Sequence, residues 1–129
     1  MTTTTAIGAP FKADHVGSLL RPESIHQARK EFKEGVITAE QLREIETEEI
    51  KRIVDKQLEI GLKAVTDGEF RRTFWHTDFM SHIGGFEGYT PEHGYQFNKG
   101  ETEAYDVRNI GKISFDPAHP FVRDFVEFK

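Results

Sequence analysis

The sequence contains no cysteine, a single tryptophan and no long hydrophobic run. The absence of cysteine excludes disulfide bonds, a thiol nucleophile and any cysteine-ligated zinc site within these residues. No apolar stretch approaches the roughly 20 residues that span a bilayer. The start, MTTTTAIGAP, also lacks the basic and apolar regions of a secretory signal. We therefore expect a cytoplasmic protein that does not associate with membranes.

Charge and composition further restrict the class of protein and the partners that it could bind. The 129 residues carry 22 acidic and 17 basic side chains, which gives a formal net charge of −5. This balance argues against a nucleic-acid partner, because proteins that bind nucleic-acid backbones usually carry a basic excess. The hydrophobic fraction of 36 %, which includes eleven phenylalanines, is typical of a globular chain rather than a disordered one. The length predicts a single domain.

The spacing of apolar residues predicts helices that alternate with strands. Helices are expected at 22–34, 38–61, 71–83 and from residue 119 onward, and strands at 13–16, 63–67 and 105–115. Residues 1–10 are expected to form a flexible arm, and the glycine-rich residues 84–104 an irregular excursion or a hairpin. This alternation is typical of parallel βαβ units. The chain is therefore predicted to be the opening part of a larger α/β protein.

The helix at 38–61 has the clearest signals. Thr38 and Gln41 match the capping-box pattern at its start. An apolar stripe follows, formed by Leu42, Ile45, Ile50, Ile53, Val54, Leu58 and Ile60. In the next predicted helix, Trp75 and Phe79 are expected to belong to the core.

Two segments carry the candidate chemistry, because functional groups in parallel α/β proteins gather where strands end. The first segment, ADHVGSLLRP, contains His15 and a small-residue turn at Gly17 and Ser18 whose backbone amides suit a carboxylate. The second, VTDGEFRRTFWH, contains Asp67 and Glu69, and a carboxylate there suits a substrate ammonium group or acts as a general base. Together the two segments suit a zwitterionic amino acid.

Simpler interpretations apply to the same residues. A lone histidine such as His15 is more often a hydrogen-bonded structural residue, and Asp67 followed by glycine is a common turn. Arg71 and Arg72 are either solvated surface charges or partners of the acidic residues on the helix at 38–61. No histidines show the spacing of helical metal ligands, so no metal site is assigned within this chain.

The motifs DHVGSLLRP and VTDGEFRRTFWHTDF, with the long helix between them, resemble the cobalamin-independent methionine synthase family. The likeness extends over about residues 10–129 and is nearest to the short, single-barrel bacterial members. It implies that residues 11–129 are the N-terminal portion of a (β/α)₈ TIM barrel. The barrel would be incomplete in this chain, since the whole fold needs about 250 residues.

The resemblance also implies a function. Members of this family transfer a methyl group from a methyltetrahydrofolate-like donor to a thiol such as homocysteine, using zinc and no cobalamin. The turn at Val16, Gly17 and Ser18 would hold the amino acid's carboxylate, and Gly68 with Glu69 would hold its amino group. His15 and Asp67 are expected in the same binding site from their places beside the two turns, and not from the resemblance, since His15 stands where the two-domain members of the family carry a different residue.

The expected zinc ligands are histidine, cysteine and glutamate on later strands of the barrel. The chain alone is therefore expected to be inactive. Two alternatives stay open at this point. One is a stand-alone α/β binding module without catalysis, and the other is an acid–base enzyme that uses His15, Asp67 and Glu69 directly.

Overall fold

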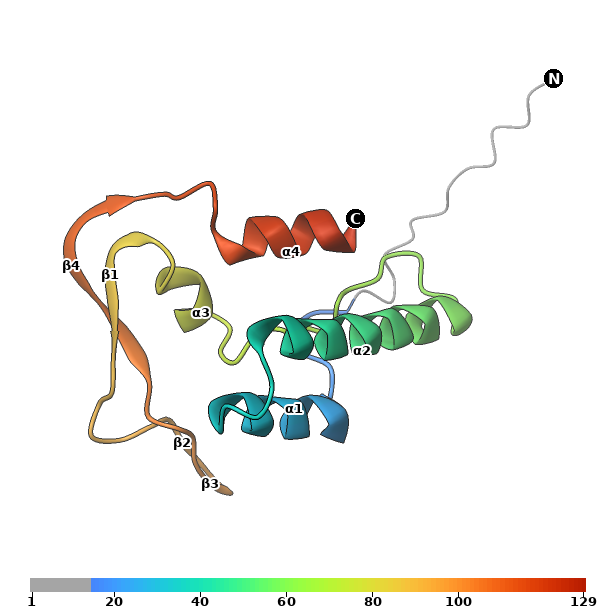
Figure 1. Ribbon diagram of the computed structural model, residues 1–129, viewed down its shortest axis with the longest axis horizontal. Coiled ribbons are helices and arrows are strands. Elements are labelled where there is room, and N and C mark those ends of the chain that lie inside the picture. The colour runs from blue at the N-terminus through green and yellow to red at the C-terminus, as the bar shows by residue number, and fades with distance from the viewer. Residues whose placement is uncertain (1–14) are drawn as a thin grey trace. The chain divides into compact units, whose positions relative to one another are not determined.

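The computed structural model describes residues 15–129, which form a mixed α/β chain (Figure 1). The described residues divide into two compact units, one that ends at Arg71 and one that spans Arg72–Lys129. The flexible arm predicted for residues 1–10 lies outside the described residues, as does the first half of the strand predicted at 13–16.

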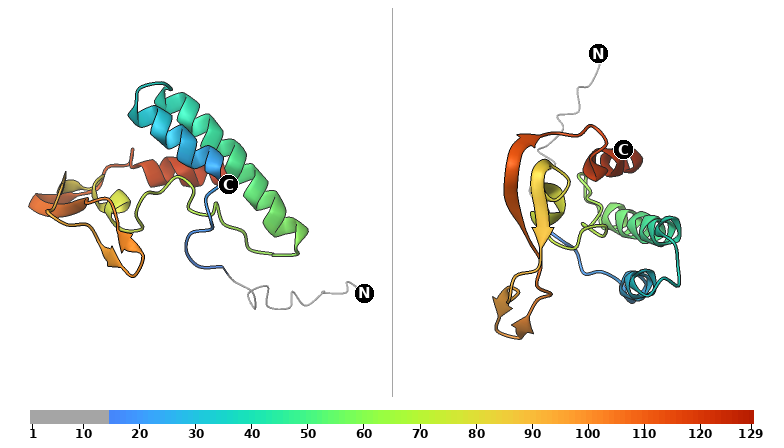
Figure 2. Two further views of the ribbon diagram at one scale, coloured as in Figure 1. Left: turned by 90° about the horizontal axis from the view of Figure 1, so that it is seen from below. Right: turned by 60° about the vertical axis from the view of Figure 1, so that its left-hand side comes forward.

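The first unit is built on two helices that lie side by side, α1 (Glu23–Lys33) and α2 (Ala39–Glu59) (Figures 1 and 2). Both confirm the predicted helices. The core between them consists of Ile25, Ile50 and Phe70, and partly buried apolar side chains pack around it. Burial of these side chains stabilises the unit by about 25 cal/mol for each Å² of apolar surface removed from water.

The start of α2 follows from the capping-box sequence. The Thr38 hydroxyl accepts a hydrogen bond from the backbone N–H of Gln41 at 3.2 Å, and the Gln41 side chain accepts one from the Thr38 backbone N–H at 2.8 Å. Two backbone donors that the helix leaves unpaired are satisfied in this way. Although α2 has 21 residues, neither it nor any other helix within residues 15–129 is long and apolar enough to cross a membrane.

The strand predicted at 63–67 is wrong, and His15 and Val16 are not in a strand either. The reason lies in the hydrogen bonds of Thr66, whose backbone N–H and C=O both bind the side chain of Gln57. These are the groups that a neighbouring strand would use in a ladder. The segment joins neither of the sheets in the described residues.

The second unit contains two small antiparallel sheets (Figure 2). Strand β1 (Gly84–Tyr89) pairs with β4 (Asp106–Ser114), and β2 (Gln96–Phe97) pairs with β3 (Gly100–Glu101). The strand predicted at 105–115 and the hairpin predicted within 84–104 are confirmed. The predicted parallel pairing is wrong for residues 15–129, where every ladder is antiparallel. The described residues thus show a mixed α/β fold and not a TIM barrel.

The predicted helix at 71–83 is wrong in its extent, since only α3 (Thr77–Met80) is helical. The Asp78 carboxylate accepts hydrogen bonds from the backbone N–H groups of Thr73 (2.6 Å) and Phe74 (3.2 Å). An aspartate side chain that binds backbone in this way competes with helix formation. Trp75 is 74 % exposed and Phe79 is 41 % exposed, so neither belongs to the core. The helix expected after residue 119 is confirmed as α4 (Pro120–Phe128).

Candidate functional site

The first candidate segment is an exposed bend before α1. Val16, Gly17 and Ser18 are all exposed, and Gly17 has a φ of +93°, which glycine adopts without steric cost. His15 donates a hydrogen bond from Nε2 to the Gly17 carbonyl oxygen at 2.9 Å. The predicted turn is therefore present, and His15 contacts its backbone, as the structural interpretation of this histidine expects.

The second candidate segment is a tight turn from Asp67 to Phe70. The Phe70 N–H donates to the Asp67 carbonyl oxygen at 3.4 Å, and the Glu69 N–H donates to Asp67 Oδ1 at 2.9 Å. Both central residues have positive φ, +69° at Gly68 and +56° at Glu69, as in a type I′ turn. Within residues 15–129, Glu69 is the only residue other than glycine with this conformation. A non-glycine residue pays about 1–2 kcal/mol for it, and such strain concentrates at functional sites.

The two segments meet although 50 residues separate Ser18 from Gly68. The Leu19 N–H donates to the Gly68 carbonyl oxygen at 3.1 Å, and the Arg21 guanidinium donates to the Glu69 carbonyl oxygen at 3.0 Å. The Ser18 hydroxyl lies 2.9 Å from the Leu19 carbonyl oxygen and 3.4 Å from that of Gly68. The single hydroxyl proton serves one of these acceptors at a time. Tertiary contacts thus bring together the two turns that the sequence identified separately.

A buried side chain of α2 holds the entry to the Asp67–Phe70 turn. Gln57 is 4 % exposed, and its amide accepts from the Thr66 N–H at 3.0 Å and donates to the Thr66 carbonyl oxygen at 2.8 Å. The sequence interpretation missed this residue. Its signal was a polar side chain within the apolar stripe, three residues after Val54 and four after Ile53.

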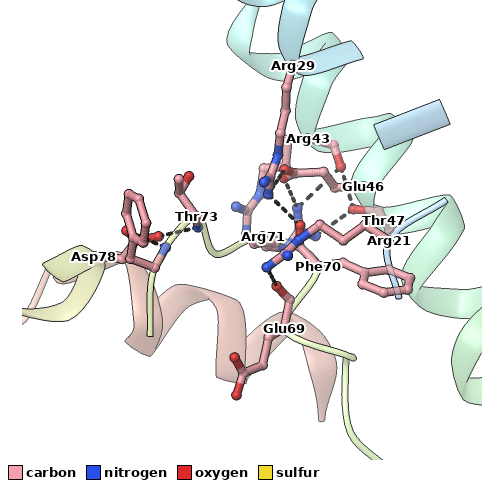
Figure 3. A network of polar contacts seen from close by, with 11 residues as sticks. Arg21, Arg29, Arg43, Glu46, Thr47, Glu69, Phe70, Arg71, Thr73 and Asp78 are labelled. Carbon is pink, nitrogen blue, oxygen red and sulfur yellow. Dashed lines mark hydrogen bonds and ion pairs between the residues drawn. The ribbon is translucent and has the colours of Figure 1, made fainter. Parts of the chain in front are cut away.

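A second polar group of α2, Glu46, is buried between two arginines (Figure 3). Its carboxylate oxygens lie 3.3 Å from Arg29 Nη2 and 3.2 Å from Arg71 Nη1. Arg71 also donates to the Thr47 hydroxyl at 2.7 Å, and Arg29 donates to the Phe70 carbonyl oxygen at 2.6 Å. The pairing of Arg71 with an acidic residue of the helix is confirmed. In Figure 3 the Glu69 carboxylate points away from this cluster.

Alanine at Gly68 is expected to destabilise the turn by about 2–4 kcal/mol, because it combines a positive φ with overpacking. A Cβ at this position would lie 2.9 Å from the buried Phe70 ring and 3.4 Å from Leu19 Cβ. Gly61→Ala is the matched control, since Gly61 has a φ of +91° but open space around its Cβ position. Urea denaturation monitored by circular dichroism measures both changes. Equal losses for the two variants would show that the Phe70 contact is unimportant.

The second unit contributes a buried histidine that the sequence interpretation did not single out. His119 is 2 % exposed, and its Nδ1 accepts a hydrogen bond from the Phe121 N–H at 3.1 Å. Because Nδ1 is an acceptor, the proton lies on Nε2, which donates to the Phe79 carbonyl oxygen at 2.9 Å. Both ring nitrogens are occupied by backbone groups, so His119 stabilises the fold of this unit.

The described residues do not fit a zinc site. Nowhere within residues 15–129 do three or more histidine, cysteine, aspartate or glutamate side chains gather closely enough to hold a metal ion. Zinc in proteins takes at least three such ligands. No step that uses zinc is therefore assigned to the described residues.

Comparisons with known proteins identify the family of the chain. Residues 11–98 match the family described as the cobalamin-independent synthase catalytic domain. The chain is 51 % identical to the uncharacterised protein YxjH of Bacillus subtilis over 117 residues, which cover 91 % of this chain and 31 % of YxjH. It is also 35 % identical over 71 residues to a 5-methyltetrahydropteroyltriglutamate–homocysteine methyltransferase of Bacillus cereus, covering 55 % of this chain and 9 % of the enzyme.

A solved structure shows the same likeness. A crystal structure from Listeria monocytogenes, of a proposed vitamin-B12 independent methionine synthase, is 49 % identical to the chain with a TM-score of 0.74. The match covers 94 % of this chain and 32 % of the Listeria protein. The chain therefore spans about a third of the length of this protein and of YxjH. The family match extends over both turns and the helices between them. The chain therefore belongs to the cobalamin-independent synthase catalytic-domain family.

Proposed function

We propose that this chain supplies the amino-acid-binding part of a cobalamin-independent thiol methyltransferase. The reaction transfers a methyl group from a methyltetrahydrofolate-like donor to a thiol such as homocysteine and forms methionine. The observation that carries the proposal is the hydrogen bond from the Leu19 N–H to the Gly68 carbonyl oxygen, which joins the two turns. The ammonium and carboxylate groups of an amino acid are attached to one carbon atom, so the groups that bind them must be neighbours.

Each turn has a chemical task in this proposal. The exposed bend at Val16, Gly17 and Ser18 binds the substrate carboxylate through backbone amides. The Ser18 hydroxyl would turn from its backbone acceptors to donate its proton to the same carboxylate. The Glu69 carboxylate binds the ammonium group by a charge-assisted hydrogen bond. His15 and Asp67 assist from the backbone side, since His15 binds the Gly17 carbonyl and Asp67 binds the Glu69 N–H.

We assign the remainder of the reaction to a barrel of the relatives' length. Zinc, when bound, would lower the pKa of the substrate thiol so that the thiolate attacks the methyl group. Its ligands would come from parts of the longer relatives that this chain does not match. The residues described here bind and orient the amino acid.

The test is an assay of the native protein, as its source organism makes it. We expect an intact mass of about 28–44 kDa, the range of a barrel of about 250–400 residues. We also expect methyl transfer to homocysteine that a metal chelator abolishes. Activity that persists after chelation would instead favour acid–base chemistry by His15, Asp67 and Glu69.

A mass of 14.8 kDa, with cooperative unfolding and no methyl transfer, would favour the stand-alone binding module. The third outcome, a protein of barrel size that transfers no methyl group to any thiol, would contradict the proposed reaction.

A further inference from the structure

The Gln57 side chain forms three hydrogen bonds, although it lies on the apolar stripe of α2. Its Nε2 donates to the carbonyl oxygens of Ile53 (3.1 Å) and Thr66 (2.8 Å), and its Oε1 accepts from the Thr66 N–H (3.0 Å). Both amide hydrogens and the oxygen are occupied. The orientation of the amide is therefore fixed, because a flipped amide would place like groups against each other at every contact.

The Gln57 amide takes the place of a neighbouring strand. A planar amide presents a donor and an acceptor side by side, as a peptide group does. Thr66 directly precedes the Asp67–Phe70 turn, and the Thr66 hydroxyl accepts from the Gly68 N–H at 3.2 Å. The position of Thr66 therefore sets where the turn begins.

Hydrogen bonds from two arginines also hold the end of the turn, at Glu69 and Phe70. Arg21 donates to the Glu69 carbonyl oxygen and Arg29 donates to the Phe70 carbonyl oxygen. Between these two anchored ends Glu69 adopts its left-handed conformation, with a φ of +56°. A strained conformation persists only where the surrounding structure determines it. Loss of the hydrogen bonds between Gln57 and Thr66 would let the turn relax and move the Glu69 carboxylate.

We propose that Gln57 is a positioning residue for the Glu69 carboxylate and thereby sets the preference of the site for substrates that carry an amino group. This inference rests on the proposed function. Gln57 does not touch the substrate. It acts through Thr66 and the backbone of the turn, and the property it controls is the discrimination between an amino acid and the same molecule without its amine.

The experiment measures that discrimination in the native protein by isothermal titration calorimetry. The probes are methionine and 3-(methylthio)propionate, which lacks the amino group, and the ratio of their affinities is the amine preference. Gln57→Leu is expected to lower the amine preference about tenfold or more, because a small displacement of a binding group strongly weakens its interaction. The affinity for 3-(methylthio)propionate should stay unchanged. Gln57→Glu retains the acceptor for the Thr66 N–H and should give an intermediate preference.

Gln27→Leu is the matched control. Gln27 is exposed on α1 and donates to Glu31 at 2.7 Å, so its loss should leave the amine preference at the wild-type value. The double variant Gln57→Leu with Glu69→Gln should show the same preference as Glu69→Gln alone, because Gln57 acts through Glu69.

The outcomes separate the two proposals. No amine preference in the wild-type protein, or none lost in Glu69→Gln, would overturn the proposed function. A preference that falls in Glu69→Gln but stays at the wild-type value in Gln57→Leu would overturn only the inference about Gln57. If circular dichroism shows that Gln57→Leu is unfolded, Gln57→Glu decides, and an unchanged preference in that variant overturns the inference.

Discussion

Replacing Glu46 by alanine is expected to lower the free energy of unfolding by about 3–5 kcal/mol, the usual cost of removing one partner of a buried ion pair. The Glu46 side chain is 10 % exposed and lies between Arg29, at 20 %, and Arg71, at 11 %. Without the carboxylate, two positively charged groups would lie close together in a largely desolvated environment. Urea denaturation of the native protein, monitored by circular dichroism, measures the loss.

Glu44→Ala is the matched control for this prediction. Glu44 is exposed on the same helix, and surface substitutions of this kind usually change stability by less than about 0.5 kcal/mol. Glu46→Gln retains an acceptor for one arginine and should lose less stability than the alanine variant. If Glu46→Ala is as stable as Glu44→Ala, the buried cluster does not stabilise the fold.

Replacing Glu69 by glutamine is expected to weaken the binding of methionine about 30-fold or more, since loss of one member of a hydrogen-bonded charge pair costs about 2–5 kcal/mol. Glutamine has the same shape as glutamate and the same tendency to resist a positive φ. The substitution therefore keeps the size of the side chain and removes the negative charge that would face the substrate ammonium group. Calorimetric titration with methionine measures the change.

The thermal unfolding temperature is the control for Glu69→Gln. Glutamine matches glutamate in size, and the substitution retains the Glu69 carbonyl oxygen to which the Arg21 guanidinium donates. We therefore expect an unfolding temperature close to that of the wild-type protein. Methionine binding at wild-type affinity in this variant would remove Glu69 from the site.

The two predictions concern connected parts of the first unit. Glu46 binds Arg29, and Arg29 in turn donates to the carbonyl oxygen of Phe70, the residue after Glu69. The cluster that stabilises the unit thus also anchors the exit from the proposed ammonium-binding turn. We accordingly expect Glu46→Ala to reduce methionine affinity as well as stability, whereas Glu69→Gln reduces affinity alone.

The sequence predicted the elements that depend on local signals. The helices α1, α2 and α4 form where apolar periodicity places them, and the capping box at Thr38 fixes the start of α2. Interactions within one or two turns of the chain determine these elements, so a single sequence contains the information. The two motifs that indicated an amino-acid site could also be identified from the sequence, because glycine and acidic residues at turns have recognisable spacing.

The incorrect predictions have two causes. In some segments a side chain binds the backbone groups that a helix or sheet would use, and in others the pairing strand lies far away in the sequence. The segment at 63–67 has the composition of a strand, but Gln57 occupies the backbone groups of Thr66. The helix predicted at 71–83 shortens to α3 because Asp78 binds backbone N–H groups ahead of it. Strand β4 was predicted, but its antiparallel partner β1 follows from pairing between distant segments.

The sequence by itself determined the family, the helices α1, α2 and α4, and the two turns with their acidic and small residues, because each depends on neighbouring residues and on motif spacing. The tertiary structure alone decided that Ser18 and Leu19 lie against Gly68, and that Gln57 and Glu46 support the turn from the apolar side of α2. These contacts join residues far apart in the chain. Their physical basis is the requirement that buried polar groups find partners, and only the folded chain shows which partners are within reach.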